Sequence, residues 1–185
     1  GAPPTIPPDA TLVFEVELLS WKSVKDISGD GGIIKKIVAE GSGWEKPRDV
    51  DEVQVKYTAK LADGSVFAES GDEGTLFTVK DGHFCPALSK IVSTMQKDEV
   101  VTCEVKPTYG FGAEGYGGKL GPNESFTLEA EVLFWRKVTE IQNTSGLVVK
   151  KQFTEGEGYE KPNEGATIKA KYTLCLEDGT EVEKY

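Results

Sequence analysis

The side chains best suited to covalent or metal chemistry are few in this sequence and lie apart. His83 is the only histidine, and the three cysteines are Cys85, Cys103 and Cys175. No cysteine or carboxylate group joins His83 at the spacing that a metal site needs, and no Ser/His/Asp or Cys/His arrangement indicates a nucleophile. Cys85 and Cys103 stand among apolar neighbours, which is typical of core thiols. We therefore predict a protein without a metal, a cofactor or a covalent catalytic group.

Ring side chains are the other residues with a chemical use, and several gather in one stretch. Residues 107–121 contain six glycines together with Tyr109, Phe111 and Tyr116. Glycine permits positive φ and close approach of the backbone, which is typical of a shaped surface loop. Such a loop beside an apolar strand could form a shallow apolar pocket. The alternative is a long connection whose rings merely cap the core, and these residues alone leave both interpretations open.

An apolar pocket without reactive groups can still catalyse one reaction, the rotation of an X–Pro peptide bond. Amide resonance gives this rotation a barrier of roughly 18–20 kcal/mol. Twisting the amide removes the charge separation that water stabilises, so a desolvated aromatic pocket favours the twisted state. One or two hydrogen bonds would be enough to position the substrate.

The elements that must position these rings follow from the hydrophobic period. Residues 52–61 and 126–134 alternate between apolar and polar side chains, which is typical of half-buried strands. Residues 85–95 change to helical spacing directly after Pro86, a residue that suits the first helical turn. Shorter strands are predicted over residues 11–19, 33–40, 66–70, 75–79 and 100–106, with charged linkers at 22–27 and 136–141. This order predicts an α+β fold in which one short helix packs on an antiparallel sheet.

The sequence also repeats itself at a distance of 114–115 residues, as Trp21 and Trp135 illustrate. G-S-G-W-E-K-P at residues 41–47 returns as G-E-G-Y-E-K-P at 156–162. A period of this length is that of whole domains rather than of solenoid units. We therefore expect three parts: residues 1–24 as the C-terminal strand of a preceding domain, residues 25–138 as a complete domain, and residues 139–185 as the N-terminal part of a following domain.

Composition limits the partners and the compartment. The formal net charge is −10, from 31 acidic and 21 basic residues. This balance argues against nucleic acid, which needs a basic surface, and against an anionic membrane surface. No apolar run approaches the roughly 20 residues of a membrane-spanning helix. The odd, unpatterned set of cysteines indicates a reducing compartment, so we expect the cytoplasm, with the nucleus as a second location.

Several of these runs resemble the FKBP family of immunophilins, which are peptidyl-prolyl cis–trans isomerases that bind tacrolimus and rapamycin. The runs are V-K-Y-T-A-K-L-A-D-G-S-V-F, Y-G-F-G-A-E-G-Y-G and P-P-D-A-T-L-V-F-E-V-E-L-L. The tandem W-E-K-P and Y-E-K-P turns are similar to those of the large three-domain plant members. In those proteins a tetratricopeptide segment binds a heat-shock chaperone and another stretch binds calmodulin, and neither segment is in these 185 residues. The resemblance implies tandem FKBP-like domains, each with its sheet wrapped on one short helix, that bind proline-containing peptides or client proteins.

The resemblance also assigns a pocket, residue by residue. Phe84 and Cys85 fall at the helix entrance, where one backbone N–H meets the ligand, and the backbone carbonyl at His83 also contacts ligand. The complete set is Tyr57, Phe67, Ala68, His83, Phe84, Cys85, Leu88, Phe111, Tyr116, Leu120 and Leu128. Ile6 and Phe14 fall at pocket positions of the preceding domain.

This sequence departs from the family at several of these positions. Ala68 replaces an acidic residue, Leu88 replaces a tryptophan at the pocket base, and Phe111 replaces a tyrosine whose hydroxyl meets the ligand. Leu128 replaces a phenylalanine, and Thr75 or Leu76 replaces another. A missing hydrogen bond in a buried site costs on the order of 1–3 kcal/mol. We therefore expect the complete domain to bind tacrolimus or rapamycin weakly and to isomerise prolyl peptides weakly.

Two functions remain open at this stage. In the first, the chain is part of a chaperone-associated isomerase whose activity lies mainly in the preceding domain, since the following one also departs from the pattern at Val182 and Glu183. In the second, the residues present form a non-catalytic protein-binding and spacer module of a co-chaperone. For the complete domain itself, the departures from the family pocket favour the second function.

Overall fold

The computed structural model describes residues 6–19, 23–142, 144–145, 148–154 and 156–184. The chain divides into two compact units, one up to Phe153 and one from Thr154 onward, which are described separately. Trp21, one half of the tryptophan repeat, lies outside the described residues, as does Lys22 at the start of the first predicted linker. No described helix is both long and apolar enough to cross a membrane.

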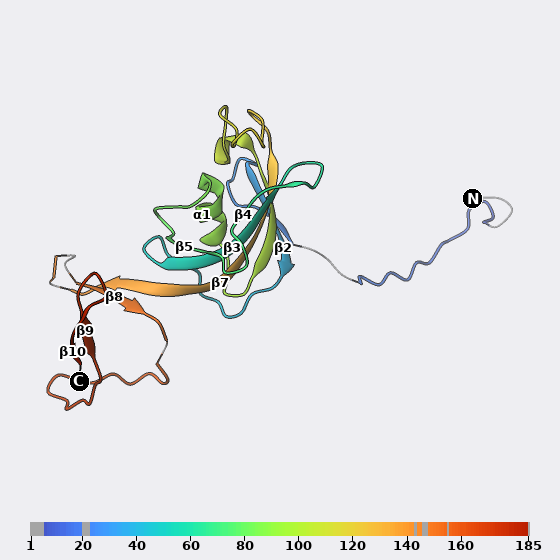
Figure 1. Ribbon diagram of the computed structural model, residues 1–185. Coiled ribbons are helices and arrows are strands. Elements are labelled where there is room, and N and C mark those ends of the chain that lie inside the picture. The colour runs from blue at the N-terminus through green and yellow to red at the C-terminus, as the bar shows by residue number, and fades with distance from the viewer. Residues whose placement is uncertain (1–5, 20–22, 143, 146–147, 155, 185) are drawn as a thin grey trace. The chain divides into compact units, whose positions relative to one another are not determined.

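The first unit is built on one antiparallel sheet with a single α-helix among its described residues (Figure 1). The sheet order is β1-β2-β6-β7-β3-β4, while β5 pairs with β3 and β8 pairs with β7. The strands are β1 Val24–Asp26, β2 Ile33–Ala39, β3 Glu52–Lys60, β4 Val66–Glu69, β5 Thr75–Thr78, β6 Val100–Val105, β7 Phe126–Glu140 and β8 Val149–Gln152. The helix is α1, Pro86–Val92, and a 3-10 turn, η1, spans Pro107–Tyr109. The predicted α+β fold is confirmed.

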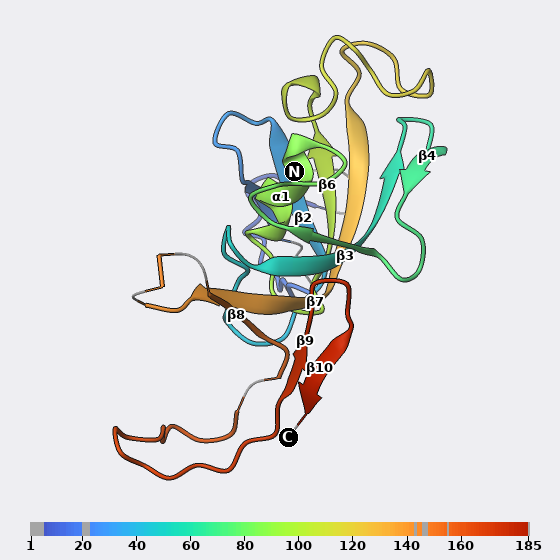
Figure 2. The same cartoon turned by 60° about the vertical axis from the view of Figure 1, so that its left-hand side comes forward.

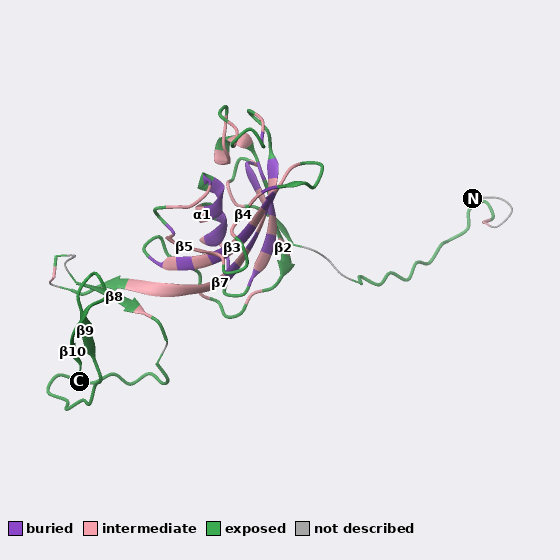
Figure 3. Ribbon diagram, viewed as in Figure 1, coloured by how far each residue is buried: buried purple, intermediate pink, exposed green. Residues whose placement is uncertain are grey.

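The core lies between α1 and one face of the sheet (Figure 2). Every second residue of β3 is buried, and α1 adds four buried side chains from Ala87 to Val92. Figure 3 shows this alternation as bands along β3 and the buried face of α1. Burying an aliphatic side chain contributes about 1.5–3 kcal/mol, so the period-two pattern of β3 reports which face the helix covers.

The helix is shorter than its sequence pattern predicts. Cys85 is the N-cap and Pro86 occupies the first turn, but α1 ends at Val92 rather than at Met95. The next residues tighten into i→i+3 hydrogen bonds, with Thr94 N donating to Ile91 O and Met95 N to Val92 O. Met95 is still fully buried. An apolar residue at this position indicates that the side chain is buried, and the tighter turn buries Met95 as well as an α-helix would.

Both predicted linkers are wrong, because each is part of a strand. The segment 22–27 contains β1, and the segment 136–141 is the second half of β7, which continues without a break to Glu140. Charged residues suggested exposed connections, but a strand forms wherever a partner strand supplies hydrogen bonds. The partner of β1 is β2, and the partner of β7 is β8; each partner follows after a turn.

The same strand pairing occurs twice at the period of the sequence repeat. Val24 pairs with Lys36 in β1 and β2, and Val138 pairs with Lys151 in β7 and β8. The turns agree as well, since Ile27 N donates to Ile33 O at 3.1 Å and Ile141 N donates to Val148 O at 3.0 Å. β7 is therefore the last strand of one repeat and the first strand of the next.

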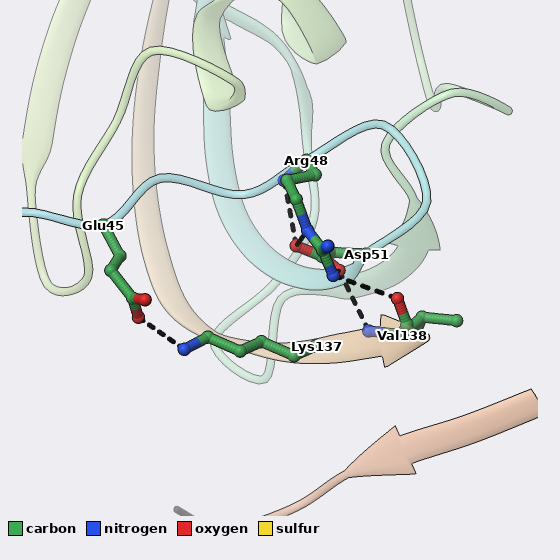
Figure 4. A network of polar contacts seen from close by, with 5 residues as sticks. All are labelled: Glu45, Arg48, Asp51, Lys137 and Val138. Carbon is green, nitrogen blue, oxygen red and sulfur yellow. Dashed lines mark hydrogen bonds and ion pairs between the residues drawn. The ribbon is translucent and has the colours of Figure 1, made fainter. Parts of the chain in front are cut away.

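A polar network fastens this second half of β7 to the loop before β3 (Figure 4). Asp51, only 1% exposed, accepts hydrogen bonds of 2.9 Å from the backbone N–H of Val138 and from both the backbone N–H and Nη2 of Arg48. Arg48 Nη2 also donates to the Val138 carbonyl at 3.0 Å. Lys137 forms an ion pair of 2.6 Å with Glu45. Burial would raise the pKa of Asp51, but the hydrogen bonds from Arg48 and Val138 outweigh it and lower that pKa.

The predicted strand at residues 11–19 is not formed. This segment has no strand assignment, and Phe14 and Val16 are 79% and 87% exposed. Alternation predicts a strand only where a neighbouring strand pairs with it, and none of the strand pairings among the described residues includes this segment. The assignment of residues 1–24 to a preceding domain stays a prediction.

The second unit contains a hairpin of β9, Thr173–Cys175, and β10, Glu181–Lys184. Thr173 pairs with Lys184 in the register in which Thr58 pairs with Glu69. Its described side chains are exposed. A segment of this length has too little apolar surface to build a core of its own.

Candidate functional site

Ring side chains from separate elements meet beside the N-terminus of α1. They come from β3, β4, the residue before the N-cap of α1, the loop of residues 107–125, and the start of β7. We call these six the ring cluster: Tyr57, Phe67, Phe84, Phe111, Tyr116 and Phe126. The topology explains the meeting, because β3 and β7 are neighbours in the sheet and β4 follows β3 through a tight turn.

Phe84 is the centre of the ring cluster. Its ring stacks on Tyr57 with centroids 4.8 Å apart, and it meets Phe111 and Tyr116 edge-on at 5.1 and 5.5 Å. The remaining two rings, Phe67 and Phe126, lie at 6.3 and 6.4 Å. These are the offset and edge-to-face arrangements that aromatic pairs prefer, and each pair adds about 0.5–1.5 kcal/mol beyond its buried area.

The loop over the cluster is closed by its own backbone. Tyr116 N donates to Leu120 O at 3.0 Å and Leu120 N donates to Tyr116 O at 3.2 Å. The chain makes a tight turn between these two residues, and the Phe111 ring lies 4.7 Å from the Tyr116 ring. Gly115 has a φ of +67°, and a side chain there would collide with the Leu120 carbonyl. Glycine at this position is therefore required by the close approach.

The floor of the cluster is aliphatic. Leu88 of α1 and Leu128 of β7 are fully buried, and Leu120 is 2% exposed. Cys85 is also buried, and Ala68 packs against the same core from β4. These buried side chains and the rings therefore belong to one core.

The backbone at the helix entrance is closed on itself. Cys85 N–H donates to the carbonyl of His83 at 2.7 Å, which makes a three-residue γ-turn around Phe84. Phe84 has a φ of +63°, in the left-handed region that ring residues rarely adopt. His83 itself lies beside the cluster, with Nε2 3.3 Å from the Tyr57 hydroxyl and its ring stacked on Phe77 at 5.6 Å.

Comparison with known proteins decides the family. Residues 43–133 match the family model of the FKBP-type peptidyl-prolyl cis-trans isomerase. The crystal structure of the three FKBP domains of wheat FKBP73 is 52% identical with a TM-score of 0.77, over 88% of this chain and 68% of that one. The chain belongs to the FKBP family. Its fold is the FKBP fold, and the match to a three-domain protein agrees with the tandem repeat.

Other FKBP relatives are longer proteins. Peptidyl-prolyl cis-trans isomerase FKBP4 of Homo sapiens is 35% identical over 141 residues, which are 75% of this chain and 31% of that protein. Peptidyl-prolyl cis-trans isomerase PASTICCINO1 of Arabidopsis thaliana is 38% identical over 109 residues, 59% of this chain and 17% of that protein. The chain thus spans less than a third of the length of these relatives.

Most of the residues predicted for the FKBP pocket come together. Tyr57, Phe67, Phe84, Phe111 and Tyr116 are five of the six rings, and Ala68, Cys85, Leu88, Leu120 and Leu128 belong to the core beneath or beside them. Ile6 and Phe14 were predicted for another domain's pocket, and neither packs in this core. That these residues bind ligand stays a prediction.

Two rings of the FKBP site were missed. Phe126 lies 5.4 Å from Phe67 and 5.7 Å from Phe111, although the sequence indicated only a core-facing strand position. Phe77 supports His83 from β5. The available signal for Phe126 was its place two residues before Leu128, because residues i and i+2 of a strand share a face.

The chemistry of the FKBP site is that of neutral groups. Burial raises the pKa of the Cys85 thiol to about 11 and is also the main cause that raises the pKa of Tyr57. Both groups are therefore protonated near pH 7. Among the described residues, no group of three or more His, Cys, Asp or Glu side chains could hold a metal ion. The site can exclude water, stack on a ring and offer backbone hydrogen bonds.

Proposed function

We propose that this chain is part of a multi-domain peptidyl-prolyl cis–trans isomerase, and that residues 25–138 are a complete FKBP domain that binds X–Pro segments but isomerises them weakly. The observation that carries the proposal is the ring cluster, which gathers rings from five parts of the chain into one core with the buried Leu88 and Leu128. Membership of the FKBP family supports the reaction class.

The proposed mechanism uses desolvation and positioning. Tyr57, Phe111 and Tyr116 would surround the proline ring and remove water from the amide. The twisted amide has less charge separation than the planar one, so it gains more from the apolar surroundings and the barrier of roughly 18–20 kcal/mol falls. The Cys85 N–H would donate to a substrate carbonyl, and the His83 carbonyl would accept from a substrate N–H.

The same residues explain why the activity should be weak. Phe111 has no hydroxyl to donate, and Leu88 offers less surface than the tryptophan that the family places at the pocket base. A missing buried hydrogen bond costs about 1–3 kcal/mol. At 1.36 kcal/mol for each tenfold in rate, this corresponds to a loss of about one to two orders of magnitude. Tacrolimus and rapamycin should bind weakly for the same reason.

The test is an exchange measurement of cis–trans rotation in an Ala-Leu-Pro-Phe peptide, made by NMR on the full chain beside a single-domain FKBP. We expect a rate above the uncatalysed one, with kcat/KM about 10- to 100-fold below that of the single-domain protein. Tyr116→Ala should abolish the excess rate. The control, Tyr159→Ala, removes a fully exposed ring and should change nothing. A wild-type rate equal to that of the single-domain FKBP contradicts the weak-activity proposal.

A second candidate function is a non-catalytic protein-binding and spacer module of a co-chaperone. It is favoured by β7, which joins two repeats as one strand instead of a linker. Client proteins would then bind without being isomerised. Contacts with a heat-shock chaperone and calmodulin belong to this proposal only through segments other than these 185 residues. Peptide binding without any acceleration of rotation, in the same exchange experiment, would select this function.

We propose the cytoplasm as the compartment, with the nucleus as a second location. The support is that Cys85, Cys103 and Cys175 are all free thiols. Thiols persist where the compartment is reducing. A fluorescent fusion of the full-length protein would test this location, and accumulation in a secretory compartment would contradict it.

A further inference from the structure

Phe84 packs against the three rings that are proposed to surround a substrate proline. Its centroid lies within 6.4 Å of the centroid of every other ring of the cluster, and it is the only member with this property. Tyr57, Phe111 and Tyr116, the three proposed walls, are its nearest ring neighbours. A substrate ring cannot stack on these walls while Phe84 does so.

The backbone groups proposed to hold substrate are occupied in the same state. The Cys85 N–H and the His83 carbonyl form their hydrogen bond of 2.7 Å with each other. That bond closes the γ-turn in which Phe84 has a φ of +63°. The positive φ is unfavourable for a ring residue, so the ring contacts must stabilise the turn. The side chain and the backbone therefore close the site together.

The floor explains why the ring fits there. Leu88 and Leu128 stand where the family resemblance implies tryptophan and phenylalanine, and both are fully buried. Two smaller side chains leave volume above α1, and protein interiors do not keep such volume empty. Phe84, next to the N-cap of α1, is placed to fill it.

We propose that Phe84 is a built-in plug of the prolyl pocket and the residue that determines its specificity. An X–Pro segment enters only after the Phe84 ring leaves the cluster and the turn from His83 to Cys85 opens, which frees the N–H and the carbonyl for substrate. This inference rests on the proposed function, because it takes the ring cluster to be the substrate site.

The plug lowers the apparent affinity for substrate because only molecules in the open state can bind it. When only a fraction of the molecules is open, the apparent Kd is the intrinsic Kd divided by that fraction. Five ring contacts favour the closed state, so we take the open fraction to be about one tenth or less. Removing the plug should therefore tighten binding at least about tenfold.

Three variants of the full chain separate the ring from the turn. Phe84→Val removes the ring and also disfavours positive φ, because a branched Cβ rarely adopts it. Phe84→Gly removes the ring but tolerates the turn. The control, Phe153→Val, removes a ring that is 75% exposed and lies outside the cluster.

The probe is a dye-labelled Ala-Leu-Pro-Phe peptide, titrated by fluorescence anisotropy. We expect Phe84→Val to bind it at least about tenfold more tightly than the wild type, Phe84→Gly to fall between them, and Phe153→Val to match the wild type. Folding of each variant is checked by its thermal transition. If the wild type binds the peptide and Phe84→Val binds it equally tightly or more weakly, the plug is overturned and the proposed function is kept. If neither the wild type nor a folded Phe84→Val binds the peptide, the proposed function is overturned, and the plug is overturned with it.

A measurement on the wild type covers the case in which Phe84→Val does not fold. Nuclear Overhauser effects between the rings of Phe84 and Tyr116 report the closed state directly, since their centroids are 5.5 Å apart. We expect these signals to disappear as the peptide saturates the protein. Their persistence at saturation overturns the proposal.

Discussion

Asp51 accepts a hydrogen bond of 2.9 Å from the backbone N–H of Val138, which lies 87 residues later in the chain. The contact joins the start of β3 to the half of β7 that pairs with β8. A buried carboxylate thus stabilises the place where one repeat continues into the next.

Replacing Asp51 by asparagine should destabilise the first unit. The amide cannot accept all the hydrogen bonds that reach the carboxylate from Arg48 and Val138, and hydrogen bonds to a charged group contribute about 1.5–3 kcal/mol. We expect Asp51→Asn to lower the free energy of unfolding by about 2–3 kcal/mol in urea titrations. The control is Asp49→Asn, at an exposed position two residues earlier, which should change the free energy by less than about 0.5 kcal/mol. Equal effects of both variants would contradict the role given to Asp51.

The contribution of Asp51 should also depend on pH. Burial by itself would raise the pKa of its carboxyl, but the hydrogen bonds prevail and the pKa is lower in the folded state. Such a group stabilises the fold above its unfolded pKa of about 3.9 and loses that effect as the pH falls through the folded value. The difference in unfolding free energy between wild type and Asp51→Asn should therefore be constant from about pH 5 to 8 and shrink below about pH 4. If the difference in unfolding free energy grows as the pH falls, the lowered pKa of Asp51 in the folded state is contradicted.

Lys35 and Glu99 form a buried ion pair of 2.6 Å, with side chains 6% and 3% exposed. Removing one partner leaves a buried charge without its counter-ion, so Lys35→Met or Glu99→Leu alone should cost about 3–5 kcal/mol. The double variant should cost clearly less than the sum. The half-exposed pair of Lys60 and Glu129, at 2.7 Å, is the control, and its coupling should not exceed about 1 kcal/mol. Additive effects at the buried pair would rule out this coupling.

Gly115 should tolerate no side chain. Gly115 and Gly117 both have positive φ, +67° and +54°, but only a side chain at Gly115 meets backbone, the Leu120 carbonyl. Gly117→Ala should cost about 1–2 kcal/mol of backbone strain, whereas Gly115→Ala should cost more and also loosen the loop that holds Tyr116. Thermal unfolding gives the first comparison. Hydrogen exchange of the Leu120 N–H gives the second, and equal exchange in both variants would contradict the closed loop.

Adding a hydroxyl at Phe111 should strengthen catalysis. Phe111 is partly buried in the ring cluster, and the family resemblance implies a tyrosine hydroxyl there that meets the ligand. One net hydrogen bond contributes about 0.5–1.5 kcal/mol, so Phe111→Tyr should raise kcat/KM by about two- to tenfold in the peptide exchange measurement. Phe153→Tyr adds the same hydroxyl to an exposed ring outside the cluster and should leave the rate unchanged. A rate that rises equally in both would argue against a role for this position.

The sequence was a sufficient guide wherever burial has a local period. The alternation of β3 and of the first half of β7, and the helical spacing around Leu88, report which face is covered, so the elements and the α+β class were predicted. The repeat distance predicted units of whole-domain length, but the recurring pairing of β1 with β2 and of β7 with β8 was not predicted, because both segments were expected to be linkers.

The tertiary structure decided where strands end and what fills the pocket. β1 and the second half of β7 look like charged linkers until β2 and β8 pair with them, and residues 11–19 look like a strand although no described pairing forms. Composition named the rings, but the position of Phe84 among them depends on one positive φ and on the space above Leu88. Packing space comes from residues far apart in the chain, and the residues of one segment do not show whether a partner strand will pair with it.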